Sequence, residues 1–231
     1  MKKIIVCFVL CVTVLTSFVL SGCSKDTEGA ETALQYYFSA LKGFNTNAMK
    51  DNVKGDFAGD IGFVIDELSE DFRQSDNYKK HIEDMMRALS STFVFTVDST
   101  EVVSDSRVDF NVTMKCSDVN EKDLGEYMQE KVDKYIIKNP EVYDMDSYEY
   151  EEVMIGVQAD AYEVFLEKQP RTTKNFTIAV ENVDEKWCIT TANNTEFFAF
   201  LQEIYESDDN IEMPEETEET EDAEGEETTE E

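Results

Sequence analysis

The chain has little of the chemistry that catalytic and metal sites use most. Its 231 residues include one histidine and five cysteines. One histidine cannot form the ligand cluster of a zinc site, and no Ser-His-Asp arrangement can be assigned around His81 from the sequence. His81 lies at the edge of an apolar helical stripe, which favours a structural or surface role over proton transfer. We therefore expect no catalytic activity and no cofactor.

Cysteine is also too sparse for a disulfide-stapled scaffold. Cys7 and Cys11 fall in the N-terminal apolar run and Cys23 follows it, which leaves Cys116 and Cys188 in the body of the chain. Alternation places Cys116 on the buried face of its strand and Cys188 on the face opposite Trp187, with another strand between them. A disulfide needs Cα atoms within about 7 Å, so we predict two separate free thiols.

Positive charge is scarce. Lys and Arg number 20 against 52 Asp and Glu, for a net charge of −32. Such a balance repels phosphate backbones and excludes nucleic acid as a partner, whereas cations and basic polymers are favoured. Fifteen of the acids lie in residues 206–231, which hold no Lys or Arg. We expect these residues to form a disordered acidic tail that keeps the surface soluble or binds cations weakly.

A second group of acids lies in the middle of the chain. Calcium loops need a fixed ligand spacing with a glycine at the sharp turn, and this segment has tyrosines interleaved and no such glycine. We expect a solvated acidic face and no metal site at the five residues concerned, which are Asp144, Asp146, Glu149, Glu151 and Glu152.

Long hydrophobic runs are absent except at the N-terminus. Lys2 and Lys3 precede an apolar run over residues 4–20, which indicates an export signal. The run ends in Leu20-Ser21-Gly22-Cys23, which resembles a bacterial lipobox. The resemblance implies cleavage before Cys23 and attachment of diacylglycerol and palmitate-type acyl chains there, on the outer face of the cell membrane. An ordinary signal peptide or an uncleaved anchor is the alternative.

These features divide the chain into a signal peptide (1–22), a tether (23–29), one domain (30–205) and the acidic tail (206–231). Fully extended, the tether reaches only about 20 Å, so we expect the domain close to the membrane.

Within the domain, hydrophobic periodicity changes repeatedly between helical and strand spacing. Helical stripes come first, followed by an alternating pair of strands, a helical excursion over about 121–168, a second pair of strands and a last helix. The order predicts an α+β fold in which N-terminal helices pack on a curved antiparallel sheet of about four strands, with a two-helix insertion between hairpins. The expected helices are 30–42, 60–72, one after Ser75, 121–138, 147–168 and one after Asn194; the expected strands are 93–103, 108–116, 175–180 and 187–190.

This order resembles the nuclear-transport-factor-like (cystatin-like) cone domains of many small Gram-positive lipoproteins, over about residues 30–189. The residues that carry the resemblance are Tyr37, Phe38, Leu41, Gly43 and Phe44 of the first helix, the strand 108–116, and the hairpin 176–189 around Lys186-Trp187. Many members of that family have no known activity. A cone of this kind could enclose a pocket, although an ordinary core needs the same side chains, which are Phe95, Phe110, Met114, Phe176 and Trp187.

We therefore expect a lipid-anchored extracytoplasmic module that binds or interacts with an unidentified protein or cell-envelope partner. The alternatives are a small-molecule hydrolase or isomerase that uses a cone-shaped pocket, and a passive charged spacer.

Overall fold

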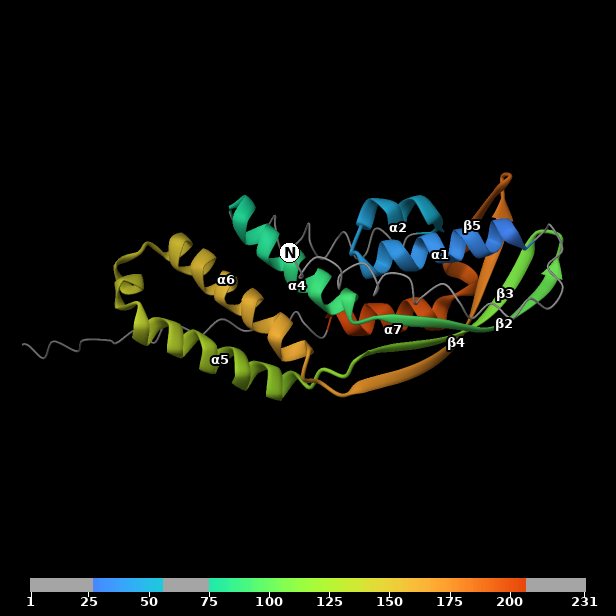
Figure 1. Ribbon diagram of the computed structural model, residues 1–231. Coiled ribbons are helices and arrows are strands. Elements are labelled where there is room, and N and C mark those ends of the chain that lie inside the picture. Colours follow the sequence, from blue (N-terminus) through green and yellow to red (C-terminus); the bar gives the residue numbers. More distant parts are fainter. Residues whose placement is uncertain (1–26, 56–74, 207–231) are drawn as a thin grey trace, which may run out of the picture.

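The computed structural model describes residues 27–55 and 75–206 (Figure 1). The expected signal peptide, the lipidation residue Cys23, the helix over 60–72 and the tail after Glu206 lie outside these residues. No helix within 27–55 or 75–206 combines the length and apolar character that crossing a bilayer requires.

The described strands form one sheet in the order β1-β5-β4-β3-β2. Neighbours are antiparallel except β1 and β5, which are parallel. The predicted α+β class is confirmed, with a fifth strand that the sequence did not reveal because β1 is only two residues long. The strands are β1 (Val53–Lys54), β2 (Val94–Ser104), β3 (Arg107–Ser117), β4 (Arg171–Val183) and β5 (Lys186–Thr190).

Side-chain caps begin several of the helices. At the helix expected after Ser75, the hydroxyl of Ser75 accepts the backbone N–H of Tyr78, and the side chains of Asn120 and Asp146 accept in the same way at the next two helices. The helices are α1 (Glu28–Lys42), α2 (Thr46–Asn52), α4 (Asp76–Ser91), α5 (Glu121–Lys138), α6 (Ser147–Leu166) and α7 (Thr195–Glu206), with 3-10 turns η1 (Pro140–Asp144) and η2 (Thr191–Asn193). The segment between the expected helices 121–138 and 147–168 is mostly η1.

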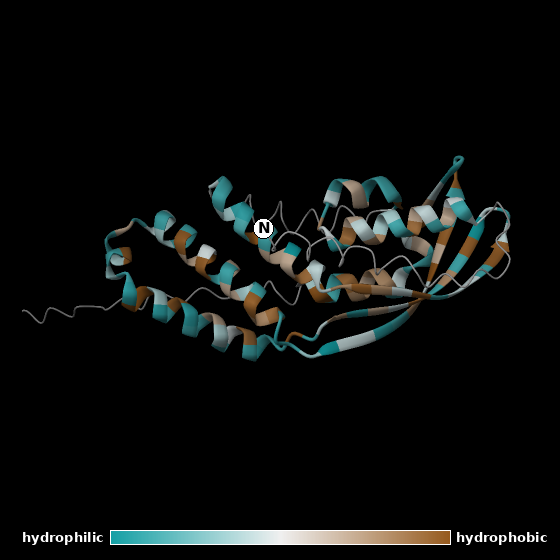
Figure 2. Cartoon of the chain, viewed as in Figure 1, coloured by the Kyte–Doolittle hydropathy of each residue, from teal (hydrophilic) through white to brown (hydrophobic). Residues whose placement is uncertain are grey.

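The main core lies between one face of the sheet and the helices α1, α4 and α7. Val108, Phe110, Val112 and Met114 alternate along β3 and are at most 1% exposed, and the alternation of polar and apolar residues is visible along the strands in Figure 2. Aromatic pairs link the layers: the Phe38 ring of α1 stacks on Phe95 of β2 with centroids 4.0 Å apart. Because the helices bury this face of the sheet, the polar side chains of the strands lie on the opposite face.

The helical insertion is confirmed as a hairpin of α5, η1 and α6 that leaves the sheet between β3 and β4 and extends past its end (Figure 1). Val132, Val142 and Met154 form a small core of their own within this arm. α6 of this arm packs against α4.

Candidate functional site

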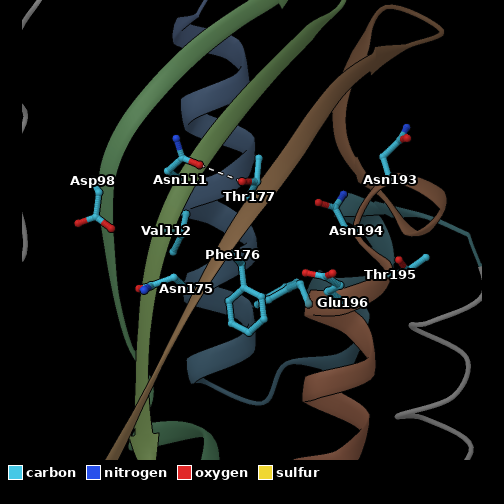
Figure 3. A pocket seen from close by; sticks show the side chains of 11 residues that line it. Asp98, Asn111, Val112, Asn175, Phe176, Thr177, Asn193, Asn194, Thr195 and Glu196 are labelled. Atoms are coloured by element: carbon cyan, nitrogen blue, oxygen red, sulfur yellow. Dashed lines mark hydrogen bonds between the residues drawn. The ribbon is translucent and has the colours of Figure 1, made fainter.

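A hollow of about 370 Å³ lies beside β4, where this strand continues past the end of β5 (Figure 3). Amides, hydroxyls and two carboxylates line most of it, and aromatic rings and a valine line the rest. The lining comprises Asp98, Asn111, Asn175, Thr177, Asn193, Asn194, Thr195 and Glu196, together with Val112, Phe176 and Phe197. Polar groups that can orient a ligand and apolar side chains that can contact it thus occur together in this lining, although typical ligand pockets are more apolar.

Hydrogen bonds order the part of this lining that lies on the solvent-facing side of the sheet. The Thr177 hydroxyl donates to Asn111 Oδ1 at 2.9 Å, and Asn111 Nδ2 donates to the Ser99 hydroxyl at 2.8 Å. The Thr113 hydroxyl lies 2.6 Å from Asp98 Oδ2 and 2.9 Å from Asn175 Oδ1. Since a hydroxyl carries one proton, it donates to one of these oxygens at a time.

An irregularity in β2 brings Asp98 into this group. The β2–β3 register shifts between Val97 and Ser99, where Val97 pairs with Val112 and Ser99 with Asn111. The extra residue is Asp98, so Asp98 and Ser99 both bond to polar side chains of β3. A regular alternation, as the sequence predicted, would have placed these neighbours on opposite faces.

Asn194 holds the other wall of the hollow. Its Oδ1 accepts the backbone N–H of Ala179 at 2.8 Å, and its Nδ2 donates to the carbonyls of Ala179 at 2.9 Å and Thr190 at 2.7 Å. Asn194 is 2% exposed. The side-chain amide thus pairs with β4 as a peptide group of a neighbouring strand would, and it fixes the start of α7 against the sheet.

The five side chains proposed from the sequence to line one pocket lie in three different places in the structure. Phe110 and Met114 lie in the main core, and Phe95 is partly buried against Phe38. Phe176 lines the hollow beside β4. Trp187 lines a separate open groove beside the start of α1, where its ring covers Gly29 so closely that a Cβ there would lie 2.4 Å from Cδ1.

Three of the remaining candidates, His81, Asp146 and Glu152, have structural partners. His81 lies on α4 against Gly156 of α6, where a Cβ on that glycine would lie 3.2 Å from Nε2. Asp146 caps α6, and the Glu152 carboxylate accepts hydrogen bonds from Ser75 and Asn77, which lower its pKa. Within residues 27–55 and 75–206 no group of three His, Cys, Asp or Glu side chains is placed to hold a metal ion.

Cys116 and Cys188 are free, as predicted, and Cys116 is buried as its strand alternation indicated; Cys188 is buried as well, although the sequence placed it on the face opposite Trp187. They belong to β3 and β5, with β4 between them. Burial, with a smaller contribution from the charge of Asp118, raises the pKa of the Cys116 thiol to about 11, and burial also raises the pKa of Cys188. Both thiols are therefore protonated at neutral pH.

We expect both thiols to resist alkylation in the folded protein. With a pKa of about 11, Cys116 has roughly a hundredfold less thiolate at pH 8 than an ordinary cysteine. Iodoacetamide labelling mapped by mass spectrometry should show slow reaction at both positions and fast reaction in urea. Since the folded pKa exceeds the unfolded one, Cys116 stabilises the fold fully below about pH 8.5, and this contribution is lost as the pH rises towards 11. Rapid labelling without urea would contradict the burial of these thiols.

Part of the lining of the hollow was recognisable in the sequence. The polar face of β3 was visible in the alternation of Asn111 and Thr113 with buried residues, and Asn194 was visible as the residue before the last helix. Nothing local showed that Asn194 would meet Ala179, or that Asp98 would face Thr113, because both contacts join segments distant in the sequence.

No protein-family profile matches the chain, and no curated protein matches it. Among solved structures, it is similar to the crystal structure of a "putative lipoprotein" (ycdA) from Bacillus subtilis, with 18% sequence identity and a TM-score of 0.47. The match covers 79% of this chain and 56% of that protein, so the chain spans little more than half the length of this neighbour. The comparisons assign the chain to no family.

Proposed function

We propose that the protein is a non-catalytic binding module, held on the outer face of a bacterial membrane by lipid on Cys23, and that it binds its ligand at the hollow beside β4. The observation that carries the binding role is the lining of this hollow, where ordered amide and hydroxyl groups converge beside Phe176 and Phe197. The single histidine, His81, is not part of the lining. The carboxylates Asp98 and Glu196 favour a ligand with positive charge.

The placement of α1 supports a position at the membrane. This helix begins at Glu28, five positions after Cys23. Five residues span at most about 18 Å, so a lipid on Cys23 would hold the domain next to the bilayer. The helices on one face of a bent sheet also support the proposed likeness to the cone-shaped domains named above.

The anchor is tested by metabolic labelling with palmitate in a bacterial host. The unmodified chain should incorporate label and sediment with membranes, whereas Cys23→Ala should lose the label and appear as an uncleaved precursor. Cys116→Ala, which removes a buried thiol, should label normally. Labelling that persists in Cys23→Ala would refute Cys23 as the lipidation residue. The acyl chains that hold the protein on the membrane would then be attached to another residue.

A further inference from the structure

β4 has one open edge. It begins at Arg171, but β5 pairs only with residues 180–183. Over residues 171–179 the pairing with β3 is continuous on the other side. Among the described residues, therefore, no strand pairs with this part of β4 along its second edge. Exposed edges of this length present a row of backbone donors and acceptors to which another chain can bind.

The bonds of Asn194 show which backbone groups face the open edge. Both the N–H and the C=O of Ala179 bond to the Asn194 side chain, on the side where β5 has ended. Backbone groups of an antiparallel strand alternate between its two neighbours, so those of Thr173, Asn175 and Thr177 point the same way as those of Ala179. The amide of Asn194 occupies the first pairing position, and of the next three, Thr177 and Asn175 line the hollow.

We propose that this edge of β4 binds an extended peptide segment carrying lysine or arginine, which adds a strand to the sheet at Thr173, Asn175 and Thr177. This inference rests on the binding role proposed for the hollow, but not on the lipid anchor. Main-chain hydrogen bonds provide the affinity in such strand addition, and side-chain pockets provide the selectivity. Here the hollow, at about 370 Å³, lies directly at Asn175 and Thr177.

The charge of the lining indicates which side chains of a bound peptide the hollow favours. The lining holds the carboxylates of Asp98 and Glu196 and no lysine or arginine, and Figure 3 shows Glu196 facing Phe176 across the hollow. The nearby Lys174 is not part of the lining, and its Nζ lies 5.6 Å from the centroid of the Phe200 ring. A second copy of this chain would bring two such acidic pairs together in a protein of net charge −32, so like charges disfavour pairing between copies.

The test is hydrogen exchange with residue resolution on the full chain in detergent. The probe is a capped ten-residue peptide of alternating lysine and valine. In the free protein the amides of Thr173, Asn175 and Thr177 should exchange quickly, and those of Lys174, Phe176 and Ile178 slowly through the β3 ladder. The probe should slow the first group at least tenfold. The same peptide with glutamate for lysine, or N-methylated at its inner amides, should not.

A pair of variants separates the backbone from the side chain. Thr177→Pro removes the N–H that faces the open edge and leaves the β3 ladder intact, so probe affinity should fall about tenfold or more. Thr177→Val keeps that N–H and removes only the hydroxyl that bonds to Asn111, so its probe affinity should fall less than that of Thr177→Pro.

Three outcomes would overturn the proposal: no protection of the three amides, equal protection of the β2 edge, or protection that increases with protein concentration without probe. The last would indicate pairing between copies. Each can occur while Cys23 still labels with palmitate, so failure of this inference is distinguishable from failure of the anchor.

Discussion

Asn194→Leu is expected to destabilise the folded protein by about 3–5 kcal/mol, because it removes three hydrogen bonds at a position that is 2% exposed. The N–H of Ala179 and the carbonyls of Ala179 and Thr190 would be left without these partners in a buried place, and each such group costs about 1–3 kcal/mol. Urea unfolding followed by circular dichroism measures the change.

Asn194→Asp keeps the shape of the side chain and changes its hydrogen bonds. An aspartate keeps the acceptor for Ala179 N–H but directs a second oxygen at two carbonyls. Its folded pKa should therefore rise above the unfolded value of about 3.9, so the variant should be least stable at neutral pH and recover stability as the carboxyl is protonated in acid. Asn193→Leu is the matched control, since Asn193 is exposed, and it should change stability by less than about 1 kcal/mol. Equal effects at the two positions would show that the Asn194 contacts contribute little.

Phe110→Ala should cost about 3–5 kcal/mol, as for other fully buried phenylalanines. Phe110 is 0% exposed and pairs with Ile178 in the middle of the sheet. The lost ring leaves a cavity that neighbours on β3 and β4 cannot fill without moving their backbones. Urea unfolding again gives the free energy, and Val102→Ala on the exposed part of β2 should change it by less than about 0.5 kcal/mol.

This variant also decides between a core and a ligand pocket for Phe110. A residue lining an accessible pocket would lose its ring at little cost, because water or ligand already occupies the space. A change below about 1 kcal/mol would therefore favour the pocket that the sequence left open, whereas the expected large loss assigns Phe110 to the core.

Local periodicity predicted most elements because their signal lies within each segment. The helix over 121–138 has the same bounds in the structure, since Asn120 caps it and Asn139-Pro140 ends it. The strand over 108–116 was equally clear, because one face is buried and the other is not. Contacts between segments distant in the sequence produce no periodic pattern within either segment. β1 has two residues and no period, and β4 extends back to Arg171 through polar residues that only its pairing with β3 defines.

The candidate site was less predictable than the fold. The pocket proposed from the sequence was lined by apolar side chains. The hollow in the structure is formed mainly by amides and hydroxyls from three strands and the start of α7. An asparagine on a strand or before a helix is ordinarily solvated or a cap. Asn194 differs because its side chain pairs with the backbone of β4, which continues past the end of β5.

The arm of α5 and α6 bears on how quickly the sheet can assemble. β3 and β4 make the most extensive pairing in the domain, yet Ser117 pairs with Arg171 across the whole insertion. As a flexible loop, residues 118–170 would have to search for this closure with an entropic cost that grows with their number. A helical hairpin forms from local contacts within microseconds, and its two ends emerge side by side, where the N–H of Asp118 bonds to the carbonyl of Pro170. The insertion thus works as a folded spacer that delivers two distant strands to each other in register.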